Sequence, residues 1–469
     1  MENTLKQSSG GIRENKMGIL PIPKLLFSMS VPIIISMLVQ ALYNIVDSVF
    51  VAMYDNVAGT AALTLAFPMQ SLMIAVSVGL AVGMNALLSR ALGEKQFERA
   101  NKIAGQGIFL TMCGYALFLL IGIFAVSFYV GTQAGDGETR TKIMEFGVDY
   151  LSIICICSIG IFIQVTCERL LQATGKTMLS MTVQLAGAIT NLILDPIMIF
   201  SLNWGIKGAA IATIAGQLVS AALGILFNLK FNKEISLKWK NLIPQWHVIK
   251  EILIIGIPSV LMQAIGSVMT FCMNKVLGGF GVDPMNIFGI YFKLQSFIFM
   301  PVFGLNNGMV PIIAYNYGAR KRERVIKTIR LSAICAIAYM LLGFSAFQLL
   351  PEQLLGIFNA TESMLAIGSV ALRIISLSFI FAGFCIVTSS VCQALGKSIY
   401  SLFSSMGRQL VVLIPTAFLL SLARDVNLVW WAIPIAEIAS VILSVIFMIH
   451  VLKKVMPKSD FPTTEPSDN

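Results

Sequence analysis

Two stripes of side chains, each ending in an aspartate, run through segments that are otherwise apolar. The first stripe consists of Gln40, Tyr43, Asn44 and Asp47. The second consists of Gln184, Ala188, Asn191 and Asp195. Because the members recur at intervals of three, four and seven residues, each stripe occupies one face of a helix. The chemistry that the stripes offer is therefore that of two carboxyl groups with neutral polar neighbours.

These two carboxyl groups predict a cation site. A carboxylate in the hydrocarbon of a membrane costs several kcal/mol, so it faces a protein interior and usually has a function. Two acids in one bundle raise each other's affinity for a proton, as burial does. Neutral oxygen atoms beside them could instead hold Na⁺, a hard cation that prefers oxygen. We predict that H⁺ or Na⁺ binds at Asp47, Asn44, Asn191, Asp195 and Thr213. The alternative is a structural polar cluster that ties the first, second, fifth and sixth spans together.

The composition indicates that lipid is the solvent. Hydrophobic residues make up 57% of the 469 residues and charged residues only 12%, and the mean hydropathy is +0.83. Ordinary soluble domains carry about 25% charged residues. The eight cysteines fall in apolar segments without the CxxC spacing of zinc or redox sites, so we interpret them as packing residues. Residues 1–24 lack the features of a signal peptide, and we expect the first span to direct insertion.

Apolar runs of about twenty residues, the length that crosses a bilayer as a helix, occur twelve times. The predicted spans are 25–52, 60–89, 103–131, 143–170, 177–201, 207–229, 249–278, 286–314, 326–350, 363–394, 399–421 and 428–452. We predict an all-α integral membrane protein with twelve transmembrane helices in two pseudo-symmetric six-helix bundles. Its predicted units are a cytoplasmic N-terminal tail (1–24), a first bundle (25–229), a cytoplasmic linker (230–248), a second bundle (249–453) and a cytoplasmic C-terminal tail (454–469).

An internal repeat divides the chain into two halves. Residues 67–71 (FPMQS) are similar to residues 292–296 (FKLQS), at an offset of 225 residues (67 to 292). Residues 172–176 (QATGK) are similar to residues 393–397 (QALGK). An even number of spans in each half makes the halves parallel, which is typical of transporters that handle substrate between their halves. At the first offset, three glycines recur as three others: Gly79, Gly83 and Gly93 as Gly304, Gly308 and Gly318.

Lysine and arginine are distributed unequally between the loops. If the N-terminus is cytoplasmic, most of the 33 lysine and arginine residues fall on the cytoplasmic side. The opposite side receives Arg140, Lys142, Lys207, Lys275 and Arg424. The positive-inside rule therefore predicts a multi-pass protein of the plasma membrane with both termini in the cytoplasm. We attribute the net charge of +10 to this topology and to contact with anionic membrane lipid, not to nucleic acid.

Further polar residues inside the spans are candidates for a substrate pathway. They are Gln40, Tyr43, Gln70, Gln184, Gln217, Gln295 and Glu437. Lys293 and Arg408 lie in the same half as Glu437, so these three either contact substrate or form a charge network with one another. Glu168 adjoins Arg169 at the inner end of the fourth span, and we interpret the two as an interfacial pair.

Two features of the sequence bear on how transport is driven. The absence of a nucleotide-binding motif bears on the energy source, and a proline in the first span bears on the movement of that helix. No segment has the GxxxxGK[ST] pattern of a phosphate-binding loop, so we expect no ATP-driven pumping by this chain alone. We also predict that the protein is not an enzyme and has no cofactor besides the coupling ion. Pro32 lies inside the first span and aligns with Pro258 inside the seventh. A proline within a helix removes a backbone hydrogen bond and bends the helix, so we predict a hinge at Pro32.

Four segments resemble motifs of the multidrug and toxic compound extrusion (MATE) family. Residues 43–47 (YNIVD) are similar to its first-helix motif, and residues 191–196 (NLILDP) to its fifth-helix motif. Residues 310–319 (VPIIAYNYGA) resemble the end of its eighth helix. Ala436 and Glu437 resemble its twelfth helix, notably in the MepA-like branch of multidrug efflux pumps. The resemblance covers the chain from Pro21 to about Leu452.

The resemblance implies a fold, an activity and roles for residues. It implies two six-helix bundles around a V-shaped cleft, from which cationic or amphipathic drugs and dyes leave in exchange for H⁺ or Na⁺. In the family, the acids that match Asp47 and Asp195 carry the coupling ion, with Asn191 and Thr213 at matching positions. One branch also places acids in its seventh and tenth helices. This sequence has none in the interiors of those spans, so we expect no second-half cation site of that kind.

Two other functions are considered. A lipid-linked oligosaccharide flippase of the same superfamily would share the helices but would need a basic cleft for a pyrophosphate headgroup. Only Lys293, Arg373 and Arg408 are available for it, and Asp47 and Asp195 would repel such a substrate. A channel or a structural membrane protein is the third possibility, although paired halves with acids in one half suit alternating access better. We therefore predict a monomeric exporter of drugs, with a contribution to antibiotic resistance, and leave the coupling ion open between H⁺ and Na⁺.

Overall fold

The structure is a computed structural model that describes residues 15–457 except for 55–57, 134–139 and 359. The residues that it describes form helices joined by turns and short irregular segments, with no strand among them. Ten helices are long and apolar enough to cross a membrane, and two bent pairs of helices qualify when each pair counts as one span. The resulting total of up to twelve confirms the predicted all-α membrane protein.

The first half of the chain supplies one bundle. Its spans are α2 (Ile22–Tyr54), α3 (Ala58–Gly93), α4 (Phe97–Phe124), the pair α6 (Arg140–Ile156) and α7 (Ile159–Ala173), α8 (Thr177–Pro196) and α9 (Gly205–Phe231). A π-helix, η1 (Ile197–Ser201), continues α8. The short helices of this half are α1 (Lys16–Ile19) and α5 (Val126–Gln133).

The second half repeats this order after a short 3₁₀-helix in the connection, η2 (Trp239–Leu242). Its spans are α10 (Trp246–Gly278), α11 (Val282–Gly318), α12 (Arg322–Leu349), the pair α14 (Glu362–Ser376) and α15 (Phe379–Ala394), the run α16 (Ser398–Met406), η3 (Gly407–Leu413) and α17 (Ile414–Ser421), and α19 (Ala432–Val455). The short helices are α13 (Pro351–Gly356) and α18 (Val426–Val429).

The fourth and tenth spans are bent, although we predicted each as a continuous helix. α6 and α7 meet at 46°, and α14 and α15 meet at 47°. The two breaks lie at residues 157–158 and 377–378, which are 220 residues apart (157 to 377). Neither break contains a proline or a glycine, so no local signal marks it in the sequence. The bends are a shared feature of the two halves.

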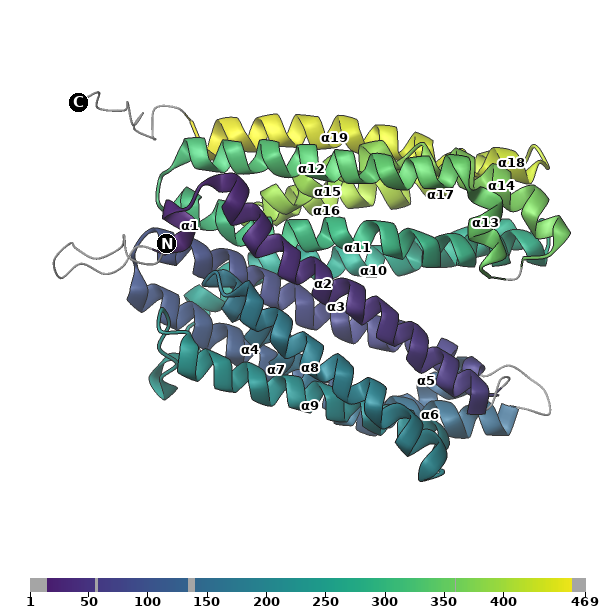
Figure 1. The fold of residues 1–469 in the computed structure, drawn as a ribbon, viewed down its shortest axis with the longest axis horizontal. Coiled ribbons are helices and arrows are strands. Elements are labelled where there is room, and N and C mark those ends of the chain that lie inside the picture. The colour runs from purple at the N-terminus through teal and green to yellow at the C-terminus, as the bar shows by residue number, and fades with distance from the viewer. Residues whose placement is uncertain (1–14, 55–57, 134–139, 359, 458–469) are drawn as a thin grey trace.

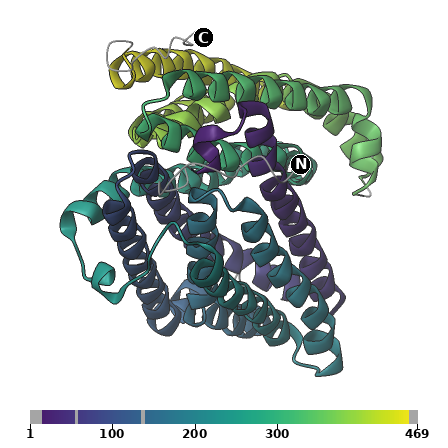
Figure 2. The same ribbon diagram turned by 60° about the vertical axis from the view of Figure 1, so that its left-hand side comes forward.

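The two halves form separate bundles that approach each other at one end. Figure 1 shows the first-half helices (purple to teal) below and most of the second-half helices (green to yellow) above. The bundles are close where α1 begins and α19 ends, and they diverge toward the opposite end. Figure 2 shows the same division after a rotation of 60°. This arrangement agrees with the V-shaped pair of bundles that the resemblance implies.

Glycines of the internal repeat lie where the bundles touch. α3 packs against α10, and α2 packs against α11, and these two pairs make the largest part of the contact between the bundles. A Cβ atom at Gly83 would collide with the carbonyl oxygen of Ile252 on α10. A Cβ atom at Gly304 would lie 2.7 Å from Cγ1 of Ile34 on α2. The repeated glycines therefore permit close approach of the helices of one bundle to those of the other.

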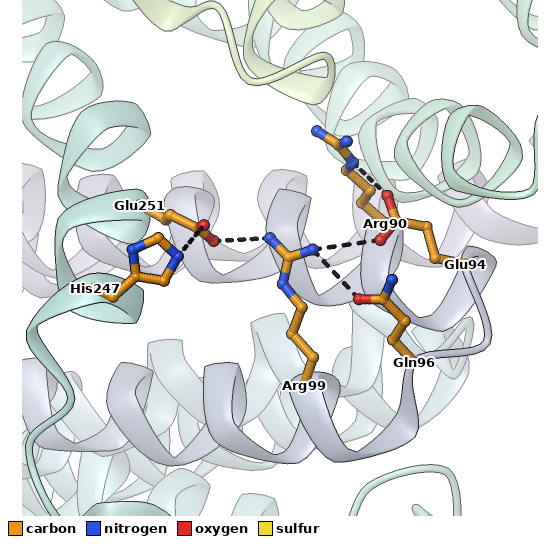
Figure 3. A network of polar contacts seen from close by, with 6 residues as sticks. All are labelled: Arg90, Glu94, Gln96, Arg99, His247 and Glu251. Atoms are coloured by element: carbon orange, nitrogen blue, oxygen red, sulfur yellow. Dashed lines mark hydrogen bonds and ion pairs between the residues drawn. The ribbon is translucent and has the colours of Figure 1, made fainter.

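Charged side chains also join the bundles at their close end (Figure 3). Arg99, at the start of α4, donates to Glu251 on α10 across 2.9 Å and to Glu94 across 3.3 Å. Arg90 donates to the other oxygen of Glu94 across 2.8 Å. His247 places Nε2 3.2 Å from the second oxygen of Glu251. Arg99 thus links the first bundle to the start of the second.

The short helix α1 contacts both bundles. Asn15 at its start donates to the carbonyl oxygen of Thr174 across 3.0 Å and to the carboxylate of Glu234 across 2.6 Å. Just beyond its end, the carbonyl oxygen of Leu20 accepts a hydrogen bond from Arg324 across 2.7 Å. Thr174 follows α7 of the first half and Glu234 lies just after α9, whereas Arg324 lies in the first turn of α12 of the second half. The segment therefore bridges the two bundles at their close end.

Candidate functional site

The aspartates of the two polar stripes meet between α2 and α8. The carboxyl groups of Asp47 and Asp195 lie within reach of a side-chain hydrogen bond. Two carboxyl groups form such a bond only when one of them carries a proton, because a carboxylate has no donor. Asp195 is 1% exposed, whereas Asp47 is half-buried. The pair can therefore hold a proton, and Asp47 is the member that remains partly accessible.

A neutral amide joins this pair to α9. Asn191 lies one helical turn before Asp195 on α8, and its Nδ2 donates to Asp195 Oδ1 across 3.3 Å. The same nitrogen lies 3.4 Å from Oγ1 of Thr213 on α9, which accepts its second hydrogen bond. Asn191 is 3% exposed, so this cluster is enclosed by the helices. The structure thus brings Asp47, Asp195, Asn191 and Thr213 together, as the sequence predicted.

Several oxygen atoms of this cluster have no partner. Asp47 Oδ1, Asn191 Oδ1, Asp195 Oδ2 and Gln217 Oε1 are buried and accept no hydrogen bond from the described residues. Gln217 lies one turn beyond Thr213 on α9. Buried polar atoms usually have a partner, because an unmade hydrogen bond costs free energy. A bound proton or a small cation would supply the missing partner for some of these atoms.

The other members of the two stripes bond to one another. Gln184 Nε2 on α8 donates to Gln40 Oε1 on α2 across 2.6 Å. The Tyr43 hydroxyl lies within hydrogen-bonding reach of Gln40 and close enough to both aspartates to interact electrostatically. Asn44 differs, because it is exposed and no contact in the described part of the chain joins its side chain to either acid. The two stripes therefore form one polar seam, with Asn44 at its side.

Tyr150 belongs to this seam, although the sequence analysis did not select it. Gln70 on α3 donates through Nε2 to the Tyr150 hydroxyl across 3.1 Å. Tyr150 lies on α6, is 3% exposed and is close enough to Asp47 to interact electrostatically. A tyrosine among apolar residues is usually interpreted as a core or interface residue. The polar partner Gln70 was the available signal, since it was already a pathway candidate.

Glu168 is an interior acid and not the interfacial residue that we predicted. It is 8% exposed and accepts a hydrogen bond from Gln164 across 3.0 Å. Its carboxyl group is close enough to Tyr43 to interact electrostatically. The neighbouring Arg169 instead donates to Gln172 across 3.1 Å. The position of Glu168 near the end of a predicted span was misleading, because its side chain faces the interior of the bundle, where Gln164 and Tyr43 lie beside it.

The second bundle contains an ion pair. Arg408 Nη1 donates to Glu437 Oε2 across 3.0 Å. Lys293 does not extend this pair into the predicted network, since it is exposed and its ammonium lies 5.7 Å from the centre of the Phe358 ring. Gln295 is half-buried on α11. Of the three charged candidates in this half, two therefore pair with each other and the third lies apart.

Pro32 is buried inside α2, and the helix continues through it. Its carbonyl oxygen accepts a hydrogen bond from the Ser36 hydroxyl across 2.9 Å. A proline at an interior position leaves one carbonyl of the preceding turn without its helical donor. Pro32 thus provides the local weakness that a hinge requires, fifteen residues before Asp47 (47 minus 32).

The sequence is similar to known proteins over most of its length. The model of the MatE family matches residues 32–197 and 258–419, one match in each half. The multidrug export protein MepA of Staphylococcus aureus (strain bovine RF122 / ET3-1) is 26% identical over 424 residues, which cover 89% of this chain and 91% of the relative. The multidrug export protein MepA of Staphylococcus haemolyticus (strain JCSC1435) is 26% identical over 440 residues, which cover 92% and 94%.

Solved structures have the same fold. The outward-facing conformation of a multidrug resistance MATE family transporter of the MOP superfamily has a TM-score of 0.89 at 22% identity, covering 95% of this chain and 99% of that one. A MOP superfamily transporter from Pyrococcus furiosus has a TM-score of 0.88 at 22% identity, with the same coverage. A substituted form of the Vibrio cholerae MATE transporter VcmN has a TM-score of 0.83 at 24% identity, covering 92% and 97%.

Proposed function

Because the chain belongs to the MatE family, we propose that it is a secondary active exporter of cationic and amphipathic organic compounds, driven by exchange for H⁺ or Na⁺. The relatives at 26% identity are named multidrug export proteins, which supports export of small molecules and not an enzymatic reaction. We place the protein in the plasma membrane as a monomer with both termini in the cytoplasm. The unequal distribution of lysine and arginine supports this orientation.

The observation that carries the proposal is the proximity of Asp47 and Asp195. A coupling cation that binds between them neutralises charge that is costly to bury. Its release leaves a negative charge buried in the first bundle, which is costly and favours a different arrangement of the bundles. If cation and compound stabilise different arrangements of the bundles, each turnover exchanges one for the other. Alternating access of the space between the two bundles then gives export against a gradient.

The geometry favours H⁺ as the coupling ion. A proton shared between two carboxyl groups gives each group a hydrogen-bond partner, and it needs no further ligand. Na⁺ is the second candidate because Asn191 Oδ1, Asp195 Oδ2 and Asp47 Oδ1 are oxygen atoms without partners. Oxygen is the ligand that such a hard cation prefers. With Thr213 Oγ1 beside them, these atoms could complete a small oxygen site.

Ethidium efflux from proteoliposomes tests the function and the ion together. The purified chain is reconstituted with ethidium inside, and efflux is driven separately by an H⁺ gradient and by a Na⁺ gradient of equal size. We expect stimulation by the H⁺ gradient, reversed influx when the gradient is inverted, and no effect of ATP. Stimulation by Na⁺ alone would assign the oxygen cluster to Na⁺. Efflux that responds to neither gradient would contradict secondary transport.

A flippase for an anionic headgroup is not favoured by the second bundle. Of the three basic residues available for such a cleft, Arg408 is paired with Glu437. Lys293 and Arg373 are exposed side chains on α11 and α14. The polar interior of the first bundle carries three acids, Asp47, Glu168 and Asp195. Such an interior attracts cations and repels a pyrophosphate.

A further inference from the structure

The ion pair in the second bundle is unusual in having one enclosed and one accessible member. The Glu437 side chain on α19 is 4% exposed, whereas the Arg408 side chain on η3 is 34% exposed. Glu437 Oε2 is bonded to Arg408, and its other oxygen, Oε1, is buried without a partner in the described part of the chain. A buried ion pair offers little net stability, because desolvation of the charges offsets their attraction. Stability alone therefore does not explain why these charges are in a bundle core.

The pair lies inside the bundle and not on its outer face. Tyr291 on α11 is close enough to both charges to interact electrostatically. Cys385 on α15 is close enough to Glu437 to interact electrostatically, and it lies near Ser440, one turn further along α19. Elements α11, α15, η3 and α19 thus surround the carboxylate. Since Arg408 is still about a third exposed, this interior is open on the side of the guanidinium.

The corresponding place in the first bundle is closed and uncharged. At the offset of the QATGK and QALGK repeats, 221 residues (172 to 393), Arg408 corresponds to Gly187 on α8. Glu437 corresponds to Gln217 on α9, at an offset of 220 (217 to 437). A Cβ atom at Gly187 would collide with the Ser220 hydroxyl, so α8 and α9 are in close contact there. The second bundle has a π-helix and a charge pair where the first has a tight glycine contact. π-Helical turns often occur at functional sites.

An aromatic wall lies beside the carboxylate. The Tyr291 ring is stacked near Phe288 at 6.2 Å between centroids, and Phe288 lies 6.4 Å from Trp430. The indole nitrogen of Trp430 is buried and has no hydrogen-bond partner among the described residues. Aromatic faces attract organic cations, particularly away from water. Tyr291 is 3% exposed, Phe288 1% and Trp430 0%, so these rings form a buried wall behind the carboxylate. A carboxylate with an unpaired oxygen in front of such a wall is suited to an organic cation.

We propose that Glu437 binds the cationic group of the exported compound, and that Arg408 occupies this carboxylate while no compound is bound. This inference rests on the proposed export function and names the substrate site within it. The guanidinium acts as an internal competitor, which keeps the buried carboxylate from being left unpaired. An incoming cation takes the place of Arg408, whose accessible side chain moves toward the open side of the bundle. The coupling site at Asp47 and Asp195 stays in the other bundle, so substrate and coupling ion occupy separate sites.

Opposite effects of two substitutions test this competition. Ethidium binding is measured by fluorescence on the full-length protein in lipid nanodiscs. Arg408→Met removes the competitor, so ethidium should bind about tenfold more tightly, because the competent carboxylate is no longer masked. Glu437→Gln removes the ligand group and should weaken binding about tenfold or more. Lys293→Met is the matched control, since it removes an exposed cation of the same bundle, and it should leave binding unchanged.

A double variant covers the case in which Arg408→Met does not fold. Arg408→Met with Glu437→Gln leaves no unpaired charge in the core, so it should fold and still bind ethidium as weakly as Glu437→Gln. Ethidium should also slow the alkylation of Cys385 in the otherwise unaltered chain, measured by mass spectrometry. The proposal would be overturned if the double variant bound ethidium as tightly as the unaltered chain. It would also be overturned if Arg408→Met and Glu437→Gln changed the affinity for ethidium in the same direction. If the unaltered chain exports no ethidium under any gradient, the proposed export function is contradicted, and not only the substrate site at Glu437.

Discussion

Gly93 and Gly318 lie against each other's helices at the close end of the two bundles. A Cβ atom at Gly93 would collide with the carbonyl oxygen of Tyr315 on α11. A Cβ atom at Gly318 would collide with the carbonyl oxygen of Arg90 on α3. The two glycines are 225 residues apart (93 to 318) and end equivalent helices of the repeat. Their contact joins the two halves almost symmetrically, and it exists only while the bundles are closed at this end.

Gly93→Ala should therefore favour opening at this end. The added methyl group meets backbone atoms, which cannot turn aside as a flexible side chain can, so the closed arrangement should lose about 1–3 kcal/mol. The readout is the distance between spin labels at Glu98 and Glu323, exposed positions on α4 and α12. We expect a larger population at long distance. Gly289→Ala on α11 is the control, because a Cβ atom there meets nothing within 4 Å, and identical distance distributions for the two variants would contradict the interpretation.

Arg99→Gln should loosen the same end through the charges shown in Figure 3. The substitution removes the ion pairs with Glu251 and Glu94. Since exposed pairs contribute only about 0.2–1 kcal/mol each, the melting temperature should hardly change. The labelling rate of a cysteine placed at Val455, which lines the cleft beside these residues, should rise and should become less dependent on salt. Glu98→Gln is the control on the same helix, and an equal increase in that variant would exclude a specific role for Arg99.

Pro32→Ala should lower transport several-fold without loss of expression. The alanine restores the donor that the helix lacks at this position, so α2 becomes stiffer between its buried start and Asp47. Ethidium efflux and the amount of protein in the membrane should be measured together. Pro258→Ala, at the corresponding position of α10, shows whether the effect is specific to the bundle with the aspartates. Unchanged efflux in Pro32→Ala would make the proline a static feature.

Glu234 gives a pH dependence to the contact made by Asn15. Burial raises the pKa of the Glu234 carboxyl above its usual value, although Lys176 and Asn15 act in the opposite direction. A raised pKa in the folded state means that stability is greatest at low pH and falls as the pH rises through that pKa. Glu234→Gln keeps an oxygen that can accept from Asn15, so its melting temperature relative to the unaltered chain should rise with pH. A difference that is constant from pH 4 to pH 8 would contradict this account.

The fold was predictable because its signals are long and repeated. Twelve apolar runs and the glycines from Gly79 to Gly93, with their counterparts, set the number of spans and the division into bundles. Asp47 and Asp195 were predictable because a buried acid on a polar helical face is rare enough to be informative, and Asn191 because it lies on the same face of the helix as Asp195. These signals depend on residues within one helix, and the spacing of residues along the sequence shows which of them share a helical face.

Other features of the site depend on how helices meet, and the sequence does not report that. The bends at residues 157–158 and 377–378 have no proline or glycine. Glu168 faces the bundle interior, although its place near the end of a span indicated the membrane interface. Tyr150 joins the site only because α6 places it beside Gln70 of α3. Arg408 reaches Glu437 from a π-helix, whose extra residue in the turn alters which side chains face the core.

The coupling role of the aspartates predicts a separation of binding from transport. Asp195→Asn keeps the size and hydrogen-bonding capacity of the side chain but removes the acid that we propose to share the coupling cation with the neighbouring Asp47. The variant should fold and bind ethidium, because the proposed substrate carboxylate is Glu437 in the other bundle. Asp47→Asn should behave in the same way. The double variant should be little worse than either single one, since each substitution disables the same unit.

Gradient-driven ethidium efflux by Asp195→Asn proteoliposomes, with ethidium binding measured on the same protein, tests the central claim most directly. The account predicts binding within about twofold of the unaltered chain and loss of stimulation by either an H⁺ or a Na⁺ gradient. Efflux by Asp195→Asn at the rate of the unaltered chain, under the gradient that drives the latter, would contradict the claim that Asp47 and Asp195 carry the coupling ion.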